Sequence, residues 1–395
     1  GYLLGQQGRP SDSLSLLAPI GIAEYSQNYS FHSKKLSKDL AKIQSEEDEG
    51  VFRAKLLNVL KKTLTEVKSK LAENLYNNYD GAVYVGTHAI IMDQLISTIY
   101  RMILRRHYKK NTKKIIGLSI LAVGGYGRGE LAPHSDIDLL FLYQKDQLTK
   151  HQPFIEYILY LLWDLGLKVG HATRTSDQCL EAANDDITIM TTLLEIRYIE
   201  GDKKLFENFE KRLRSWISEK PVSYFVTEKL RERDSRHKLH GATRYMVEPQ
   251  IKEGKGGLRD LHTLFWIAKF AYKVRSVEEV IELGVLRVSE AKNFAASQRF
   301  LWTVRCFLHL RSKREDDRLT FDAQIDIAPL MGFSSRGGMR GVERFMKRYF
   351  LAARQVGTLT RIFCSAIESD FENKGIFALG RILNFVSFYN QSRLA

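Results

Sequence analysis

Cysteine is scarce in this chain of 395 residues, which contains only three. The three lie far apart, show no metal-ligand spacing and leave an odd one over, so neither a disulfide framework nor a cysteine zinc site is expected. They are Cys179, Cys306 and Cys364. We therefore expect reduced thiols, buried in the core of a protein that works in the cytosol.

Membrane-length hydrophobic runs are also not apparent. No apolar stretch has the length expected of a transmembrane span, and the first residues lack the charged start and continuous hydrophobic region of a secretory signal. The sequence therefore predicts a soluble, cytoplasmic protein with no membrane partner. The first residue is glycine rather than methionine, which leaves the authentic start of the protein open.

Positive charge exceeds negative charge, with 60 Lys and Arg against 46 Asp and Glu, a net charge of +14 and a pI of about 9.5. This balance favours anionic partners such as nucleotides, nucleic acid or an acidic protein. The charge is spread along the chain, and its one dense basic run, residues 105–114, is typical of a solvated helix end. Basic and aromatic residues do not interleave as in surfaces that stack bases, so nucleic acid is not the expected partner.

The apolar pattern gives a coarse secondary structure. Residues 1–48 show little periodicity and predict a flexible arm. From residue 51 onward, apolar residues recur every three or four positions, which predicts amphipathic helices. Residues 167–175 are predicted to form a strand and residues 187–199 a helix. Most of the chain beyond residue 203 is predicted to be helical.

The most informative stretch is residues 118–143, LSILAVGGYGRGELAPHSDIDLLFLY. One apolar run ends in Gly124 and Gly125, and a second begins at Asp136 and Asp138. This order predicts a strand, a glycine turn, a short polar helix or loop, and a second strand. Because side chains alternate along a strand, the two aspartates should point to the same side.

Two neighbouring carboxylates repel each other unless a cation lies between them, and their hard oxygen atoms suit Mg²⁺ or Mn²⁺. Gly124 and Gly125 would let backbone N–H groups approach an anion closely, and Arg128 would add a forked phosphate donor. Each feature alone is usually structural, as a turn or a solvated strand end. Together on one strand-turn-strand unit, they favour a site for a nucleoside triphosphate and its metal.

A second glycine-rich stretch, residues 251–261, reads IKEGKGGLRDL. A glycine turn that leads into a helix N-terminus can bind an anion. One interpretation is that Lys252, Lys255 or Arg259 reaches the triphosphate. The other is a rigid joint between domains, and the sequence alone leaves both open.

Both stretches resemble motifs of a known family. Residues 124–131 and 133–140 resemble the nucleotidyltransferase signature of the polymerase-beta superfamily and, more narrowly, the N-terminal part of bacterial PII uridylyltransferases. Residues 251–261 resemble another stretch typical of these enzymes. The resemblance covers roughly residues 51–371 and implies an α+β fold, with a polymerase-beta-like domain around a small mixed sheet and a mainly helical second domain. The expected division is residues 1–48, 49–220, 221–370 and 371–395: an arm, the transferase domain, the helical domain and a truncated tail.

The resemblance implies transfer of UMP from UTP to a tyrosine hydroxyl of a PII-type regulatory protein, with release of pyrophosphate. It makes Asp136 and Asp138 the catalytic ligands of Mg²⁺ or Mn²⁺. The nucleotide-binding residues that it implies are Gly124, Gly125, Arg128, Ser135, Lys252 and Arg259. Two alternatives stay open: a related nucleotidyltransferase that acts on another hydroxyl, such as an RNA end or an antibiotic, and a non-catalytic regulator that keeps the scaffold.

The chain departs from the family pattern at several points. Polymerase-beta-like sites commonly take a third carboxylate from the strand predicted at residues 167–175, which here offers Arg174. His171 on this strand is a candidate general base, although a strand histidine is more often structural. Lys255 replaces the proline usual in the second motif. The sequence has no His-Asp dipeptide, so the hydrolase activity and the glutamine sensing of the full-length enzymes are not expected of it.

Overall fold

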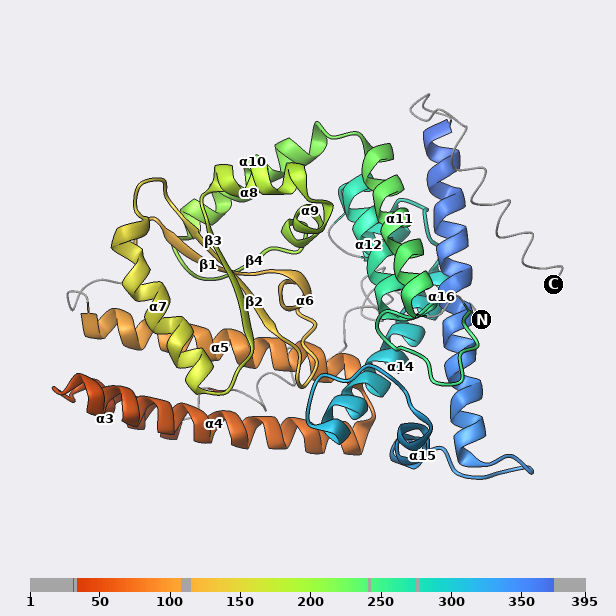
Figure 1. Cartoon of the computed structure of the whole chain (residues 1–395), viewed down its shortest axis with the longest axis horizontal. Coiled ribbons are helices and arrows are strands. Elements are labelled where there is room, and N and C mark those ends of the chain that lie inside the picture. The colour runs from red at the N-terminus through yellow and green to blue at the C-terminus, as the bar shows by residue number, and fades with distance from the viewer. Residues whose placement is uncertain (1–30, 32–33, 108–114, 241–242, 275–276, 373–395) are drawn as a thin grey trace, which may run out of the picture.

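The computed structural model describes residues 31, 34–107, 115–240, 243–274 and 277–372. It shows an α+β protein in which a four-stranded sheet with flanking helices lies beside an all-helical part (Figure 1). The α+β expectation is therefore confirmed. Most of the predicted arm, the end of the basic run and nearly all of the predicted tail lie outside the described residues.

The described elements follow one another along the chain in an order that places all four strands before residue 202. They are α3 (Lys34–Gln44), α4 (Glu49–Asn78), α5 (Gly81–His107), β1 (Leu118–Ala122), α6 (Gly124–Gly127), β2 (Ile137–Tyr143), α7 (Leu148–Asp164), β3 (Val169–Arg174), α8 (Ser176–Asp185), α9 (Ile187–Leu193), β4 (Arg197–Gly201), α10 (Lys203–Ser218), α11 (Val222–His240), α12 (Leu258–Tyr272), α13 (Val277–Glu282), α14 (Val288–Ser312), α15 (Phe321–Leu330) and α16 (Gly341–Glu372).

The sheet is mixed, with strand order β3-β2-β1-β4. β1 runs antiparallel to both β2 and β4, whereas β2 and β3 are parallel and are joined by the crossover helix α7. Every residue of β1 is buried, and in β2 only Asp138 is not fully buried. Because helices cover both faces of the sheet, both faces of these central strands are apolar (Figure 1). A polar side chain in β2 therefore stands out.

Helices α4 and α5 form the base of the part that contains the sheet, and α5 also reaches the helical part. The Gly81 N–H donates to the Thr303 hydroxyl of α14 at 2.9 Å, and a Cβ at Gly81 would lie 2.2 Å from the Thr303 backbone nitrogen. Only glycine permits this approach of the two helices. The two parts are therefore packed directly against each other and not merely tethered.

By length and composition, α5 could cross a membrane, which the sequence analysis did not anticipate. It is the one such helix among the residues that the structure describes, and 72% of its most apolar window is buried inside the protein. Its side chains pack against α4, α14 and β4. The hydrophobicity of α5 is thus that of a central core helix.

The segment before residue 49 differs from the predicted arm. Residues 34–44 form α3, and Phe31, Leu36 and Ile43 are buried against the core. The acidic patch that follows begins α4, since the Asp48 carboxylate accepts from the Val51 N–H at 2.8 Å. Arg106 at the end of α5 pairs with Glu49 at 3.0 Å and donates to two carbonyls of the same patch.

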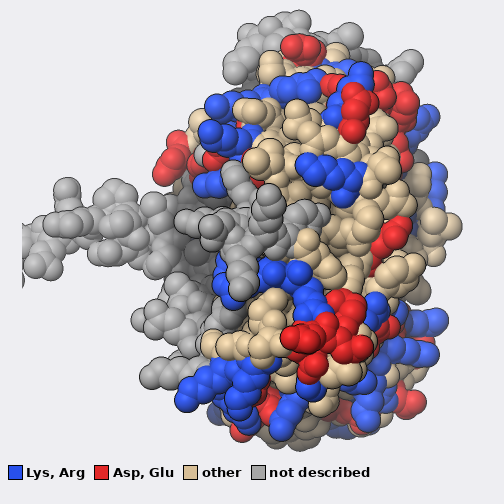
Figure 2. All heavy atoms as spheres, turned by 90° about the vertical axis from the view of Figure 1, so that its left-hand side faces the viewer, with Lys and Arg blue, Asp and Glu red and all other residues tan. Residues whose placement is uncertain are grey.

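Figure 2, which shows this end of the molecule, has Lys and Arg side chains intermixed with Asp and Glu side chains. The described part of this face is therefore not a continuous basic surface. It agrees with a positive charge that is spread along the chain and not gathered in one place.

The helix predicted over residues 187–199 is correct only in its first half. α9 ends at Leu193, and residues 197–201 form β4, an edge strand that pairs with β1. Arg197 forms an ion pair with Asp93 of α5, and Glu195 in the connection is fully buried. Periodicity could not reveal the change from helix to strand, because the pairing partner lies about 75 residues earlier in the chain.

The stability of the fold should depend on pH through His88 of α5, which is 2% exposed. Burial, together with the nearby charges of Lys68 and His134, lowers its pKa from 6.5 to about 3. Between these values the unfolded chain binds the proton and the folded chain does not, so stability falls as the pH falls through this window. We expect His88 to account for a loss of about 2 kcal/mol of unfolding free energy between pH 7 and pH 5.

Urea titrations at the two pH values test this expectation. In His88→Gln the difference between pH 7 and pH 5 should shrink by about 2 kcal/mol. The matched control is His171→Gln, since His171 is exposed on β3. An unchanged pH dependence in His88→Gln would contradict the prediction.

Candidate functional site

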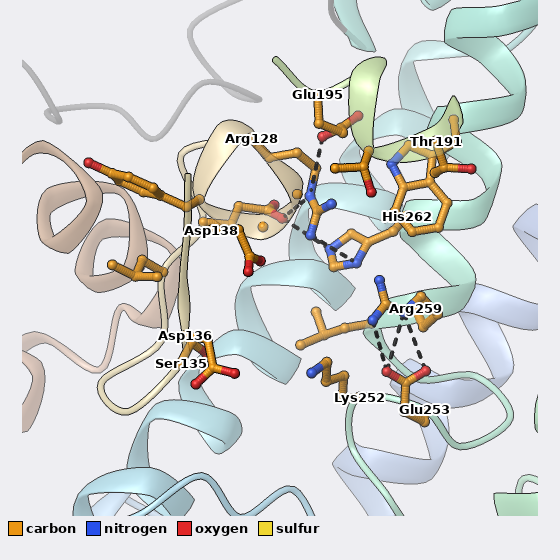
Figure 3. A pocket seen from close by; sticks show the side chains of 18 of the residues that line it. Arg128, Ser135, Asp136, Asp138, Thr191, Glu195, Lys252, Glu253, Arg259 and His262 are labelled. Carbon is orange, nitrogen blue, oxygen red and sulfur yellow. Dashed lines mark hydrogen bonds and ion pairs between the residues drawn. The ribbon is translucent and has the colours of Figure 1, made fainter. Parts of the chain in front are cut away.

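A cavity of about 400 Å³ lies where the carboxylate-bearing end of β2 faces the helical part. Its walls come from the α6 turn, the start of β2, α9, α11, the second glycine-rich turn, α12 and α14. In Figure 3, Asp136 and Asp138 lie on one side of the cavity, and Lys252 and Arg259 lie on the other. The cavity brings together all eight residues that the sequence proposed for the site: Gly124, Gly125, Arg128, Ser135, Asp136, Asp138, Lys252 and Arg259.

The two aspartates occupy different environments. Asp136 is exposed and comes just before β2, whereas Asp138 is the second residue of β2 and is partly buried. Burial and the adjacent charge of Asp136 raise the pKa of Asp138 to about 6. A cation bound between the two carboxylates would remove this repulsion.

Glycines flank the carboxylate of Asp138. A Cβ at Gly124, whose φ is +58°, would lie 3.2 Å from Oδ2 of Asp138. On the other side, β3 pairs in parallel with β2 so that Gly170 is opposite Asp138, and a Cβ there would lie 2.6 Å from Oδ1. The absence of side chains at these two positions creates the space in which the carboxylate sits.

The same register explains the missing third carboxylate. The position beside Asp138 on β3 is Gly170, while His171 is paired with Leu139 and does not line the cavity. The structure therefore gives no support to His171 as a general base. Within the described ranges, no group of three or more His, Cys, Asp and Glu side chains has an arrangement that could hold a metal ion. Any metal here would draw its remaining ligands from substrate and water.

Arg128 is fixed by two carboxylates and is not extended freely into the cavity. Its Nε is 2.8 Å from Oε2 of Glu130 and 3.6 Å from Oε2 of the buried Glu195. Glu130 also contacts His262 Nε2 at 3.0 Å and accepts from Gln298 at 2.8 Å. These contacts tie the glycine turn of the transferase part to α12 and α14 of the helical part.

The second glycine-rich turn is locked from within. The buried Asp260 accepts from the Gly256 N–H at 2.8 Å and also contacts Arg236 and His237 of α11. Gly256 has a φ of +82°, and a Cβ there would lie 2.7 Å from the carbonyl oxygen of Ala353 in α16. The turn is therefore a rigid joint, as one of the two interpretations proposed.

The other interpretation concerned the basic side chains of this turn. Lys252 and Arg259 line the cavity and pair with Glu315 at 3.2 Å and with Glu253 at 3.0 Å. Lys255 does not line the cavity. Both interpretations thus describe part of the structure, since the rigid turn carries two cations to the cavity wall.

Several cavity residues were not anticipated from the sequence. Lys229 of α11 is 2% exposed, pairs with Glu232 and lies 4.6 Å from the ring centre of Trp266. Arg128 and Arg259 each lie 5.5 Å from the same ring. Further residues of this kind are Thr188, Thr191, Thr192, Glu232, Glu253, His262, Trp302, Arg305 and Glu315. Glu253 lies in the second glycine-rich stretch, but the others belong to no local motif that could have marked them in the sequence.

The lining has more acidic than basic side chains. It contains five cations (Arg128, Lys229, Lys252, Arg259 and Arg305) and seven carboxylates (Glu130, Asp136, Asp138, Glu195, Glu232, Glu253 and Glu315). A bare triphosphate would meet a net negative wall near Asp136 and Asp138. The arrangement therefore suits an anion that arrives with divalent cations.

Comparison with known proteins agrees with the two motifs. A family model described as GlnD PII-uridylyltransferase matches residues 224–364, and one described as a nucleotidyltransferase domain matches residues 102–194. The bifunctional uridylyltransferase/uridylyl-removing enzyme of Rhodospirillum rubrum is 45% identical over 334 residues, which is 84% of this chain and 36% of that protein. The enzyme of the same name from a Bradyrhizobium species is 43% identical over 337 residues, 85% of this chain and 36% of that protein.

The chain thus spans little more than a third of the length of these relatives. Within that span, the order of the two matched models is the order of the two sequence motifs, and the cavity lies where the matched segments meet. The chain carries a nucleotidyltransferase domain, and its matched segments make it similar to about a third of the length of the bifunctional uridylyltransferase/uridylyl-removing enzymes.

Proposed function

We propose that this chain transfers UMP from UTP to a tyrosine hydroxyl of a PII-type regulatory protein and releases pyrophosphate. The observation that carries the proposal is the shared cavity of Asp136 and Asp138, which is bounded by the Gly124-Gly125 turn and by cations of the helical part. A nucleotidyltransferase needs these three elements together: a metal site, room for phosphate and a means to hold the nucleotide. UTP as the substrate also makes the cytoplasm the expected location.

Asp136 and Asp138 would hold Mg²⁺ or Mn²⁺. The residues fit such an ion, because both are hard oxygen donors, the charge of Asp136 helps to raise the pKa of Asp138, and the lining has a surplus of carboxylates. When bound, the metal would neutralise charge on the α-phosphate and align the attacking hydroxyl for in-line displacement. Water and phosphate oxygens would complete its coordination.

The remaining residues would bind and orient the nucleotide. Gly124 and Gly125 leave their backbone N–H groups open to approach, and Ser135 adds a hydroxyl donor beside Asp136. Lys252 and Arg259 approach the triphosphate from the opposite wall, and Arg128 is held in place by Glu130 and Glu195. We add the buried Lys229 to this set.

The two domains that we propose are the two parts of the chain that line this cavity. We propose a transferase domain over residues 49–220 and a helical domain over residues 221–370 that together enclose the nucleotide. The locked second turn then serves as the joint and also delivers Lys252 and Arg259.

A second candidate, a regulator that binds nucleotide without transferring it, is favoured by one observation. Gly170 lies opposite Asp138 on β3, the strand from which polymerase-beta-like sites commonly take a third carboxylate. Without it, the acceptor hydroxyl would lack an obvious proton acceptor from the protein.

Incubation of the purified chain with α-labelled UTP, Mg²⁺ and a purified PII protein separates these functions. Label should appear on the PII protein and should be lost when its acceptor tyrosine is replaced by phenylalanine. Bound UTP without transfer would favour the regulator. Label on RNA, but not on the PII protein, would point to another hydroxyl acceptor.

A further inference from the structure

The segment that delivers Asp136 has no regular secondary structure of its own. Residues 131–136 connect the α6 turn to β2. At the start of this segment, the Leu131 N–H donates to the Val85 carbonyl at 3.2 Å, and Leu131 O is 3.0 Å from Nδ1 of the buried His88. Both partners belong to α5, in the transferase domain. These contacts fix the beginning of the segment. Nearer its end, the Ser135 N–H donates to the Ala132 carbonyl at 3.2 Å, and the Ile137 N–H donates to the Lys168 carbonyl at 2.9 Å.

The helical domain adds one further contact to the turn that precedes Asp136. The His134 N–H, two residues before Asp136, donates to Nδ1 of His309 on α14 at 3.3 Å. The His309 side chain is 0% exposed, so water does not compete for this contact. His309 does not line the cavity and cannot contact the nucleotide directly.

The partners of His309 define its tautomer. Its Nε2 is 3.1 Å from Oδ1 of Asp317, and Asp317 also accepts from Arg305 Nε at 2.6 Å. Although burial opposes ionisation, His309 and Arg305 hold the pKa of Asp317 well below its usual range. A carboxylate only accepts, so Nε2 of His309 carries the proton and Nδ1 offers its lone pair to the His134 N–H.

We propose that His309, oriented by Asp317, is a positioning residue that sets the place of Asp136 and so completes the metal site from the helical domain. The chain of contacts runs from Asp317 through the imidazole to the backbone of the metal-binding segment. This inference rests on the proposed function, because it assumes that Asp136 and Asp138 bind a divalent cation. It explains why an unstructured segment can present a carboxylate in a defined place.

Three substitutions at His309 distinguish a role in positioning Asp136 from a role in core packing alone. His309→Asn places an amide oxygen near the position of Nδ1 and can still accept from His134. His309→Gln reaches instead toward the position of Nε2, and His309→Leu offers no acceptor. Asp317→Asn is a fourth variant: its amide can donate to Nε2, which favours the opposite tautomer and removes the acceptor at Nδ1.

Mn²⁺ binding to the chain without nucleotide, measured by electron paramagnetic resonance, is the readout that does not depend on activity. We expect His309→Gln, His309→Leu and Asp317→Asn to weaken Mn²⁺ binding by about tenfold or more. His309→Asn should bind Mn²⁺ within about threefold of the wild type. The metal concentration for half-maximal UMP transfer should shift in the same order. Circular dichroism and thermal unfolding identify any variant that has lost its fold.

Equal Mn²⁺ affinities of folded His309→Asn and His309→Gln would overturn the proposal, since a packing role does not distinguish the two amides. If His309 variants unfold, Asp317→Asn with unchanged Mn²⁺ affinity would overturn it equally. A wild-type chain that binds Mn²⁺ but does not modify PII protein would refute the proposed function and leave the positioning role testable. A wild-type chain that transfers UMP but binds no Mn²⁺ without nucleotide would refute the positioning role and leave the proposed function standing.

Discussion

Asp138→Asn should lower UMP transfer by about a thousandfold or more while leaving the fold intact. The carboxylate lies on a strand whose other residues are buried, and an amide of the same shape keeps the packing but loses the charge that we propose to hold the metal. Loss of several kcal/mol of charge stabilisation in the transition state corresponds to this factor. Single-turnover transfer to PII protein at saturating UTP is the direct measurement.

The matched control for this variant is Asp146→Asn, which makes the same chemical change at an exposed turn after β2. It should transfer UMP at the wild-type rate. Asp136→Asn should behave like Asp138→Asn, because both line the cavity. Full activity in either site variant would refute the metal assignment.

Gly170→Ala is expected to reduce transfer by about a hundredfold with little loss of stability. The added methyl would lie 2.6 Å from Oδ1 of Asp138, closer than the two atoms can approach, so the carboxylate must rotate away. The rotation costs little in folding because only the end of a side chain moves. Displacing a reacting group by about an ångström, however, commonly costs about a hundredfold in rate.

The contrast between rate and stability makes this prediction specific. Thermal unfolding of Gly170→Ala should match that of the wild type within a few degrees, whereas its half-maximal metal concentration should rise. Gly50→Ala, which adds the same methyl at the exposed start of α4, should leave the half-maximal metal concentration unchanged. A Gly170→Ala protein with wild-type metal dependence would show that Asp138 does not need the space beside it.

Much of the fold was accessible from the sequence. The strand-turn-strand unit, the strand over residues 169–174, the long helices and the burial of all three cysteines match the prediction. The errors have a common cause. β4 and α3 depend on distant partners, since β4 is an edge strand on β1 and the apolar face of α3 is covered by α4 and α5. The local sequence pattern contains no information about such distant partners.

The cavity residues were also beyond what local sequence pattern can predict. Lys229 lies in a helix of mixed polar composition with nothing to mark it, and it reaches the cavity only because α11 packs beside α9 and α12. His309 and Asp317 are likewise far from Asp136 in the chain. Their relation to the metal-binding segment exists only after α14 has packed against α5.

The sequence by itself determined the chemistry: a glycine pair and two carboxylates at the spacing of one strand-turn-strand unit, followed by a basic glycine turn. These features depend on side chains a few positions apart, where backbone geometry fixes their relation. Only the tertiary structure decided which cations share the cavity, why Asp138 has glycine on both sides, and how the helical domain holds the segment of Asp136. Those relations join residues tens to hundreds of positions apart, and packing alone brings them together.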